Sequence, residues 1–189
     1  MTQAVTSADE REAAGAEERP PMAAAVTLPA GRPRDNQRAR LYRAEHEVDP
    51  GRRLPTVPVL QAYVDALAAT EWFRTRWPDR SFEVRPGYGH RRATADADGV
   101  LQMPKWARSE LVVLHEVAHC VTPWTFASHG PEYAGVLLCL VRRAIGPGPA
   151  QALEDAFDRH SVRCSSAAVP PPVPAVPNAG WPSRAPGGR

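Results

Sequence analysis

The feature that most constrains this chain is an apolar run at helical spacing that carries the motif H-E-x-x-H. The apolar positions that recur every three or four residues are Leu111, Leu114, Ala118 and Val121. His115 and His119 are four residues apart, so a helix presents both imidazoles on one face, where they can bind one metal ion. Glu116 stands beside them, where its carboxylate can take a proton from a water that the metal activates. The motif therefore predicts a packed helix that carries two zinc ligands and a general base.

A catalytic zinc site needs a third protein ligand, and the sequence offers two candidates. The spacing H-E-x-x-H-x-x-G-x-x-H is excluded, because Thr122 and Thr125 stand where it requires Gly and His. His129 follows ten residues after the motif, in the run S-H-G-P-E-Y at the start of another predicted helix. Glu154 and Asp158 form E-x-x-x-D on a later predicted helix, a pattern that a solvated acidic face also gives. His129 is the preferred third ligand, and Glu154 stays open as the alternative.

The residues before the motif predict helices followed by a small antiparallel sheet. Asp35 can cap a first helix, and Thr56 opens a second whose apolar face includes Leu60 and Val64. Residues 82–85 alternate as a half-buried strand does. Asp98-Gly99 is a tight-turn signal between strands at 92–95 and 100–103.

Prolines and a glycine divide the chain after the motif into further helices. Pro123 ends the motif helix, and Pro131 suits the first turn of the next one. Gly146 with Pro147 stops that helix, and Pro149 opens a last one that reaches about His160. The expected fold class is therefore α+β, with the small antiparallel sheet packed on helices that include the motif helix.

Composition predicts one folded domain between two disordered tails. Residues 1–33 are rich in Ala, Glu, Pro and Thr, and residues 164–189 are rich in Pro, Ala and Gly, so neither segment offers apolar periodicity for a core. The domain is expected at 34–163. The N-terminal segment lacks the basic and apolar parts of a secretory signal, and no run is long enough to span a membrane. A cytoplasmic location is expected.

Charge and cysteine content limit the other function classes. The net charge of +2 is too small to indicate a nucleic-acid partner by itself. A DNA contact would use the arginines near the start of the domain, which are Arg38, Arg40, Arg43, Arg52 and Arg53. Cys120, Cys139 and Cys164 are odd in number and form no C-x-x-C, so a disulfide framework is not expected.

The motifs together resemble a known family. The run H-G-P-E-Y is similar to the H-G-x-x-F/W segment of SprT-like zinc metalloproteases, which include the Spartan proteases. The order R-D-x-Q-R-x-x-x-Y-x-A-E, W-A-R, H-E-x-x-H and H-G-P resembles small bacterial metallohydrolases, typical of actinobacteria, that are related to the SprT-like zincins. The resemblance covers residues 34–163. It implies a minimal zincin-like fold in which His115, His119 and His129 bind Zn²⁺ and Glu116 is the base. Tyr133 would pack under the loop, with an oxyanion contact as the second interpretation.

Three functions are therefore expected in order of preference. The first is a zinc-dependent metallohydrolase, a metallopeptidase that cleaves the amide bonds of a peptide or protein substrate. The second is a zinc-binding regulatory or interaction domain without turnover. The third is a DNA-associated SprT-like protein, although the chain has no C-terminal zinc ribbon with paired cysteines.

Overall fold

The structure is a computed structural model that describes residues 34–88 and 92–173. All of these residues belong to one compact unit. The helices are α1 (Arg38–Glu47), α2 (Val57–Ala69), α3 (Glu71–Arg74), α4 (Glu110–Val121), α5 (Pro131–Ala144) and α6 (Pro147–Arg159). The strands are β1 (Glu83–Pro86), β2 (Thr94–Ala95) and β3 (Val100–Met103), with short 3-10 turns at Lys105–Ala107 and Ser166–Ala168. The expected α+β class is confirmed.

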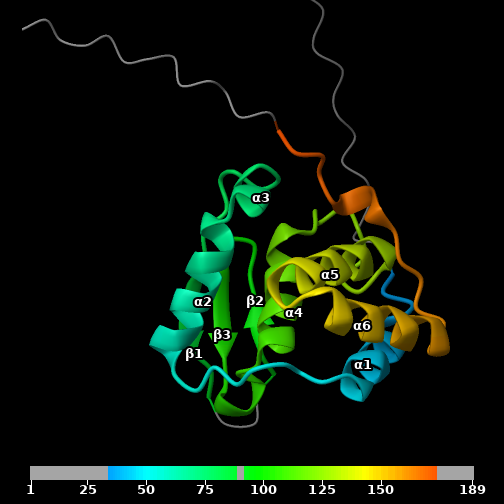
Figure 1. Cartoon of the computed structure of the whole chain (residues 1–189), viewed down its shortest axis with the longest axis horizontal. Helices are drawn as coiled ribbons and strands as arrows, with labels where there is room; N and C mark the ends of the chain where they lie inside the picture. Colours follow the sequence, from blue (N-terminus) through cyan, green and yellow to red (C-terminus); the bar gives the residue numbers. More distant parts are fainter. Residues whose placement is uncertain (1–33, 89–91, 174–189) are drawn as a thin grey trace, which may run out of the picture. The chain divides into compact units, whose positions relative to one another are not determined.

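The motif helix α4 lies between the sheet and the group formed by α5, α6 and α1 (Figure 1). It contacts β2 and β3 on one side and α5 on the other, while α2 packs against β1. Helix α6 packs on α5, and α1 packs on α6. Ten of the twelve residues of α4 are buried, so the helix that carries the motif is held on most of its surface.

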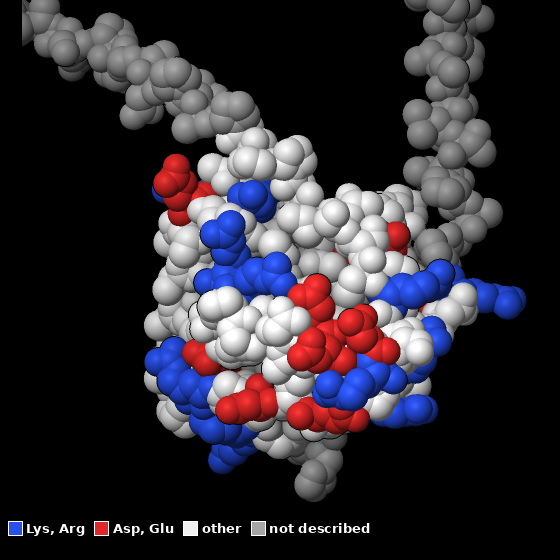
Figure 2. Space-filling view, turned by 45° about the vertical axis from the view of Figure 1, so that its right-hand side comes forward, with Lys and Arg blue, Asp and Glu red and all other residues white. Residues whose placement is uncertain are grey.

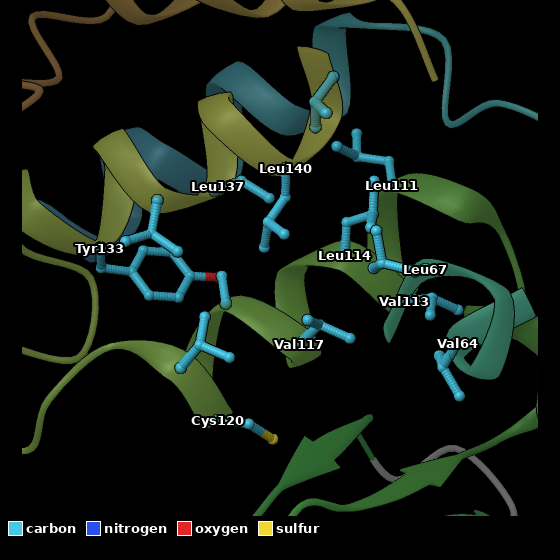
Figure 3. Close-up of a cluster of buried hydrophobic side chains, with 14 of the residues drawn as sticks. Val64, Leu67, Leu111, Val113, Leu114, Val117, Cys120, Tyr133, Leu137 and Leu140 are labelled. Atoms are coloured by element: carbon cyan, nitrogen blue, oxygen red, sulfur yellow. The ribbon is translucent and has the colours of Figure 1, made fainter. Parts of the chain in front are cut away.

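A single apolar cluster joins α2, α4 and α5 (Figure 3). Leu114, Val117, Leu137 and Leu140 are fully buried within it. Burying a side chain of this size stabilises the fold by about 1.5–3 kcal/mol relative to its exposed state. Leu111, Leu114 and Ala118, which follow helical spacing in the sequence, are thus buried where α4 packs, as expected.

The sheet differs from the expected antiparallel arrangement. Its order is β1-β3-β2, and β1 pairs with β3 in parallel, with Val84 opposite Leu101. The expected hairpin is present, since β2 and β3 are antiparallel around a turn in which Gly99 has φ = 88°. The sheet is therefore mixed. Residue alternation indicates which face of a strand is buried, but it does not identify the neighbouring strand or its direction.

Two helix starts also differ from expectation. Helix α1 begins at Arg38 after Gln37, and Asp35 makes no capping contact with it. The Gln37 side chain instead donates to the Arg163 carbonyl at 3.0 Å and accepts from the Arg163 amide at 3.1 Å. Helix α6 begins at Pro147, two residues before the expected Pro149. Pro147 both ends the preceding helix and provides a first residue with a fixed φ for the next.

The packed chain continues past residue 163, where the domain was expected to end. The Ser165 amide donates to the Pro131 carbonyl at 2.8 Å, and Ala168 is buried against α5. A Cβ on Gly135 of α5 would collide with the Ser165 carbonyl, so the two segments approach at backbone distance. The Val173 amide donates to the Thr75 carbonyl at 2.7 Å. Residues 164–173, which we call the C-terminal strap, are therefore part of the fold. The rest of the expected tail lies outside the described residues, as does the whole of 1–33.

Candidate metal centre

Three histidines from two neighbouring segments converge on one point. His115 and His119 lie on α4, and His129 lies in the turn before α5. One ring nitrogen from each lies within 4.8 Å of the others, and the Nε2 atoms of His115 and His119 are 3.2 Å apart. Imidazoles at about 2.0–2.1 Å from one tetrahedral ion would place their nitrogens at this separation. His115 and His129 are buried and His119 is half-buried. These three side chains are close enough to hold a metal ion.

The fixed protonation of two rings supports metal binding. The His115 Nδ1–H donates to Glu45 Oε1 at 2.7 Å, and the His129 Nδ1–H donates to Asp35 Oδ2 at 2.6 Å. Because an ionised carboxylate can only accept a hydrogen bond, each Nδ1 carries a proton, so in the neutral form of each ring the lone pair lies on Nε2. Histidine ligands of metals commonly have such a partner on the other nitrogen. The donor set therefore fits a cation that prefers imidazole nitrogen.

Charge and burial act differently on the two anchored rings. Burial lowers the pKa of His115, but the nearby Glu45 carboxylate outweighs that effect and raises it overall. For His129, burial is the largest effect and lowers the pKa, although Asp35 partly opposes it. A neutral imidazole is the form that binds a metal. Burial thus favours the neutral, metal-binding form of His129. The raised pKa of His115 favours its protonated form, so a metal would have to displace a proton from that ring.

The carboxylate of Glu116 lies at the junction of two cavities. A cavity of about 390 Å³ and one of about 740 Å³ both have Glu116, His115 and Tyr42 in their walls. Burial raises the Glu116 pKa to about 7, and the charge of His115 partly opposes this. A cation beside the carboxylate would lower that pKa. A carboxylate that titrates near neutrality and faces open volume is suited to move a proton.

The two tyrosines of the centre have different roles. Tyr133 is fully buried, and its ring packs against the three histidines at centroid distances of 4.5–5.4 Å. Its hydroxyl donates to the His115 carbonyl at 2.9 Å, so it supports the site from below and offers no donor to a substrate. Tyr42 on α1 stacks on His115 with a centroid distance of 5.4 Å, and its hydroxyl lies 3.3 Å from His129 Nε2. Burial raises the Tyr42 pKa, which keeps the phenol protonated.

The alternative third ligand lies elsewhere. Glu154 is 43% exposed and pairs with Arg142 at 3.0 Å. The structure places it in a surface ion pair, and the group of possible ligands contains only the three histidines among the described residues. The acidic pattern on α6 is accounted for by that surface pair.

Three of the five arginines proposed for DNA contact make contacts within the domain. Arg52 pairs with Glu110 at 3.1 Å, and Arg53 donates to the carbonyls of Lys105 and Trp106. Arg38 lies over the ring of Tyr42, 5.6 Å from its centroid. Figure 2 shows acidic side chains among the basic ones over the face that it presents. These contacts do not favour a nucleic-acid surface.

Sequence reasoning missed the contribution of α1. Arg38, Tyr42 and Glu45 share one helical face at spacings of four and three, beside the buried Leu41 and Ala44. The same segment contributed to the family resemblance, but no role at the metal centre was assigned to Asp35, Tyr42 or Glu45. The available signal was a polar stripe next to an apolar one, which is also what a surface helix shows.

Comparison with known proteins gives no family. No protein-family model matches the chain, and neither the curated proteins nor the solved structures contain a match. In the part of the chain that the structure describes, none of the helices combines the length and the apolar character needed to cross a bilayer. The function must therefore be argued from the centre itself.

Proposed function

We propose that this protein is a zinc-dependent metallohydrolase of zincin-like, SprT-related type, and that it cleaves amide bonds in a peptide or protein. The observation that carries the proposal is the placement of Glu116 beside three converging histidines and in the walls of both cavities. A purely structural zinc site is closed, with four protein ligands. Here three imidazoles are directed at one point, and no fourth His, Cys, Asp or Glu among the described residues joins them.

The residues of this chain would divide the chemistry as follows. His115, His119 and His129 would hold the ion through Nε2, with Glu45 and Asp35 fixing two of the rings. A zinc ion held there would supply a Lewis acid and lower the pKa of water to about 7. The Glu116 carboxylate would accept the proton of the attacking water and then deliver it to the nitrogen of the leaving amine.

The cavities favour turnover over a regulatory zinc domain. The smaller cavity, about 390 Å³, is bordered by Val48, Pro50, Leu111 and Val112. The larger one, about 740 Å³, extends along β2 toward Trp124. Ligand sites commonly have volumes of about 300–1,000 Å³. Open volume on both sides of Glu116 can admit an extended chain on either side of a scissile bond.

The test is proteome-wide cleavage profiling of the zinc-loaded protein against Glu116→Gln. The substitution keeps side-chain size but removes the proton acceptor, so zinc content should stay at about one per chain. Cleavage should fall by about 10²–10⁴-fold. Equal cleavage by both proteins would refute the base mechanism. Bound zinc with no cleavage by the wild type would favour the regulatory domain.

A further inference from the structure

A hydrolase of this kind gains rate from a fixed hydrogen-bond donor, in addition to the metal, at the oxygen that becomes negative when water attacks a carbonyl. The chain has four tyrosines, all among the described residues. Tyr133 is committed to the His115 carbonyl, and Tyr63 and Tyr88 are absent from the walls of both cavities. Tyr42 is therefore the one whose hydroxyl lies at the metal centre.

The position of Tyr42 is fixed from both sides. Its ring stacks on His115 with an interplanar angle of 19°, and the Arg38 guanidinium lies 5.6 Å from its centroid. Helix α1 is held in turn through Glu45, one turn further along, which binds His115 at 2.7 Å. A donor that is held in place before the reaction needs little reorganisation when the oxyanion forms.

The hydroxyl is directed at the ligand nitrogen itself. It lies 3.3 Å from His129 Nε2. Because the Nδ1–H of His129 donates to Asp35, Nε2 carries the lone pair that the ring can offer to a metal. When Nε2 gives that lone pair to a metal, it no longer accepts from Tyr42. The hydroxyl proton must then turn to another acceptor next to the ion, and Tyr42 borders both cavities in which a substrate carbonyl could lie.

We propose that Tyr42 is a catalytic residue whose hydroxyl donates a hydrogen bond to the developing oxyanion of the scissile carbonyl. This inference rests on the proposed hydrolase function. In the addition step, the water oxygen bonds to the carbonyl carbon, the C=O π electrons move to oxygen, and the water proton passes to Glu116. In the second step, the oxyanion re-forms the C=O bond, the C–N bond breaks with its electron pair leaving on nitrogen, and Glu116 returns the proton to that nitrogen. Tyr42 keeps its own proton throughout.

The direct test compares Tyr42→Phe with Tyr88→Phe on a peptide that the wild type cleaves. The first change keeps the ring on His115 and removes only the hydroxyl, whereas Tyr88 is 75% exposed and lies outside both cavities. Losing one oxyanion donor should lower kcat by about 10²–10³-fold. KM and zinc content should stay close to wild type, and Tyr88→Phe should change none of the three quantities.

A second measurement separates this inference from the proposed function. Methylphosphonate presents tetrahedral, negatively charged oxygens, and its affinity for the zinc-loaded protein can be measured by calorimetry without any turnover. A hydrogen bond to a charged acceptor contributes about 1.5–3 kcal/mol, so Tyr42→Phe should weaken binding by about 10–100-fold. Equal affinity for both proteins would overturn the role of Tyr42.

The remaining outcomes are equally decisive. Unchanged kcat in Tyr42→Phe on a cleaved peptide overturns the inference and leaves the hydrolase function standing. Two results would show that Tyr42 is a metal ligand and would also overturn the inference. One is a loss of zinc in Tyr42→Phe. The other is a phenolate-to-copper charge-transfer band that the copper-substituted wild type shows and Tyr42→Phe lacks. If the wild type cleaves nothing, the hydrolase function fails, and the phosphonate affinities then decide whether Tyr42 contacts an anionic ligand.

Discussion

The middle of the chain and its two flanks contribute to the metal centre in different ways. The middle, from α4 to α5, provides all three imidazoles and Glu116 within 15 residues of sequence. The flanks are α1 with Asp35 before it and the C-terminal strap. They provide the carboxylates that orient two rings, the tyrosine over the site, and Ala168 and Pro170 in the wall of the larger cavity. The middle holds the possible ligands, and the flanks orient two of them and enclose the larger cavity.

This difference shows why a motif identifies a site without describing it. Metal ligands are limited to a few residue types at spacings that one helix sets. The partners of those ligands can come from any element that reaches them, because a carboxylate needs only hydrogen-bond distance to an Nδ1. Each flank therefore contributes through contacts that no local spacing encodes. Four predictions test this division, from the largest expected effect to the smallest.

Removal of a ligand from the middle should abolish metal binding. His129→Ala leaves two imidazoles, which hold zinc poorly, so zinc content should fall from about one per chain to near zero. Glu154→Ala should keep its zinc, because that carboxylate pairs with Arg142 on the surface. The measurement is elemental analysis after dialysis. Zinc retained in His129→Ala and lost in Glu154→Ala would reverse the assignment of the third ligand.

The buried Glu116 carboxyl should make the metal-free protein pH-sensitive. Its folded pKa of about 7 exceeds the reference value of 4.5, so the folded state binds more protons than the unfolded state. Stability from this group is complete below pH 4.5 and is lost as pH rises through about 7. The loss amounts to about 3 kcal/mol at most. Urea unfolding in the presence of a chelator should show this decline in wild type and a weaker one in Glu116→Gln. Parallel pH profiles would contradict the raised pKa.

The flanking carboxylates should tune metal affinity without abolishing it. Glu45→Gln or Asp35→Asn weakens the partner of one Nδ1–H, and zinc affinity should fall by about 10–100-fold. Glu47→Gln is a matched control on the same helix, because Glu47 pairs with Arg159 and His160 away from the centre. Competition with a zinc-binding dye gives the dissociation constants. If Glu47→Gln weakens zinc as much as Glu45→Gln, the effect comes from α1 stability and not from orientation of His115.

The C-terminal strap should contribute measurably to stability. Gly135→Ala places a methyl group against the Ser165 carbonyl, so either α5 or the strap must shift, at a cost of about 1–2 kcal/mol. Gly148→Ala on α6 meets nothing within 4 Å and should be neutral or stabilise by up to about 1 kcal/mol. The melting temperature of Gly135→Ala should therefore fall below that of wild type, whereas that of Gly148→Ala should stay the same or rise. Equal melting temperatures would show that the strap is held only loosely on α5.

The sequence predicted most of the helices, the 98–99 turn and the three histidines, because each follows from local spacing or from proline and glycine chemistry. It did not predict that β1 joins β3 in parallel, since pairing partners depend on long-range packing. It assigned Asp35 to a helix cap, although the side chain turns to His129. It ended the domain at 163 because the strap is rich in small residues and prolines. These residues pack here by close backbone approach at Gly135, which hydrophobic periodicity does not report.

The contacts between the flanks and the histidines also set an order of events during synthesis and folding. Asp35 and His129 are separated by 94 residues, and Glu45 and His115 by 70. Closing loops of this length is entropically unfavourable until the intervening elements are packed, so such contacts form slowly. Helix α1 leaves the ribosome long before its partner rings do, and it must wait for them. A nascent chain can thus present His115 and His119 while Glu45 and Asp35 are still without their histidine partners, and the complete candidate site is a late product of folding.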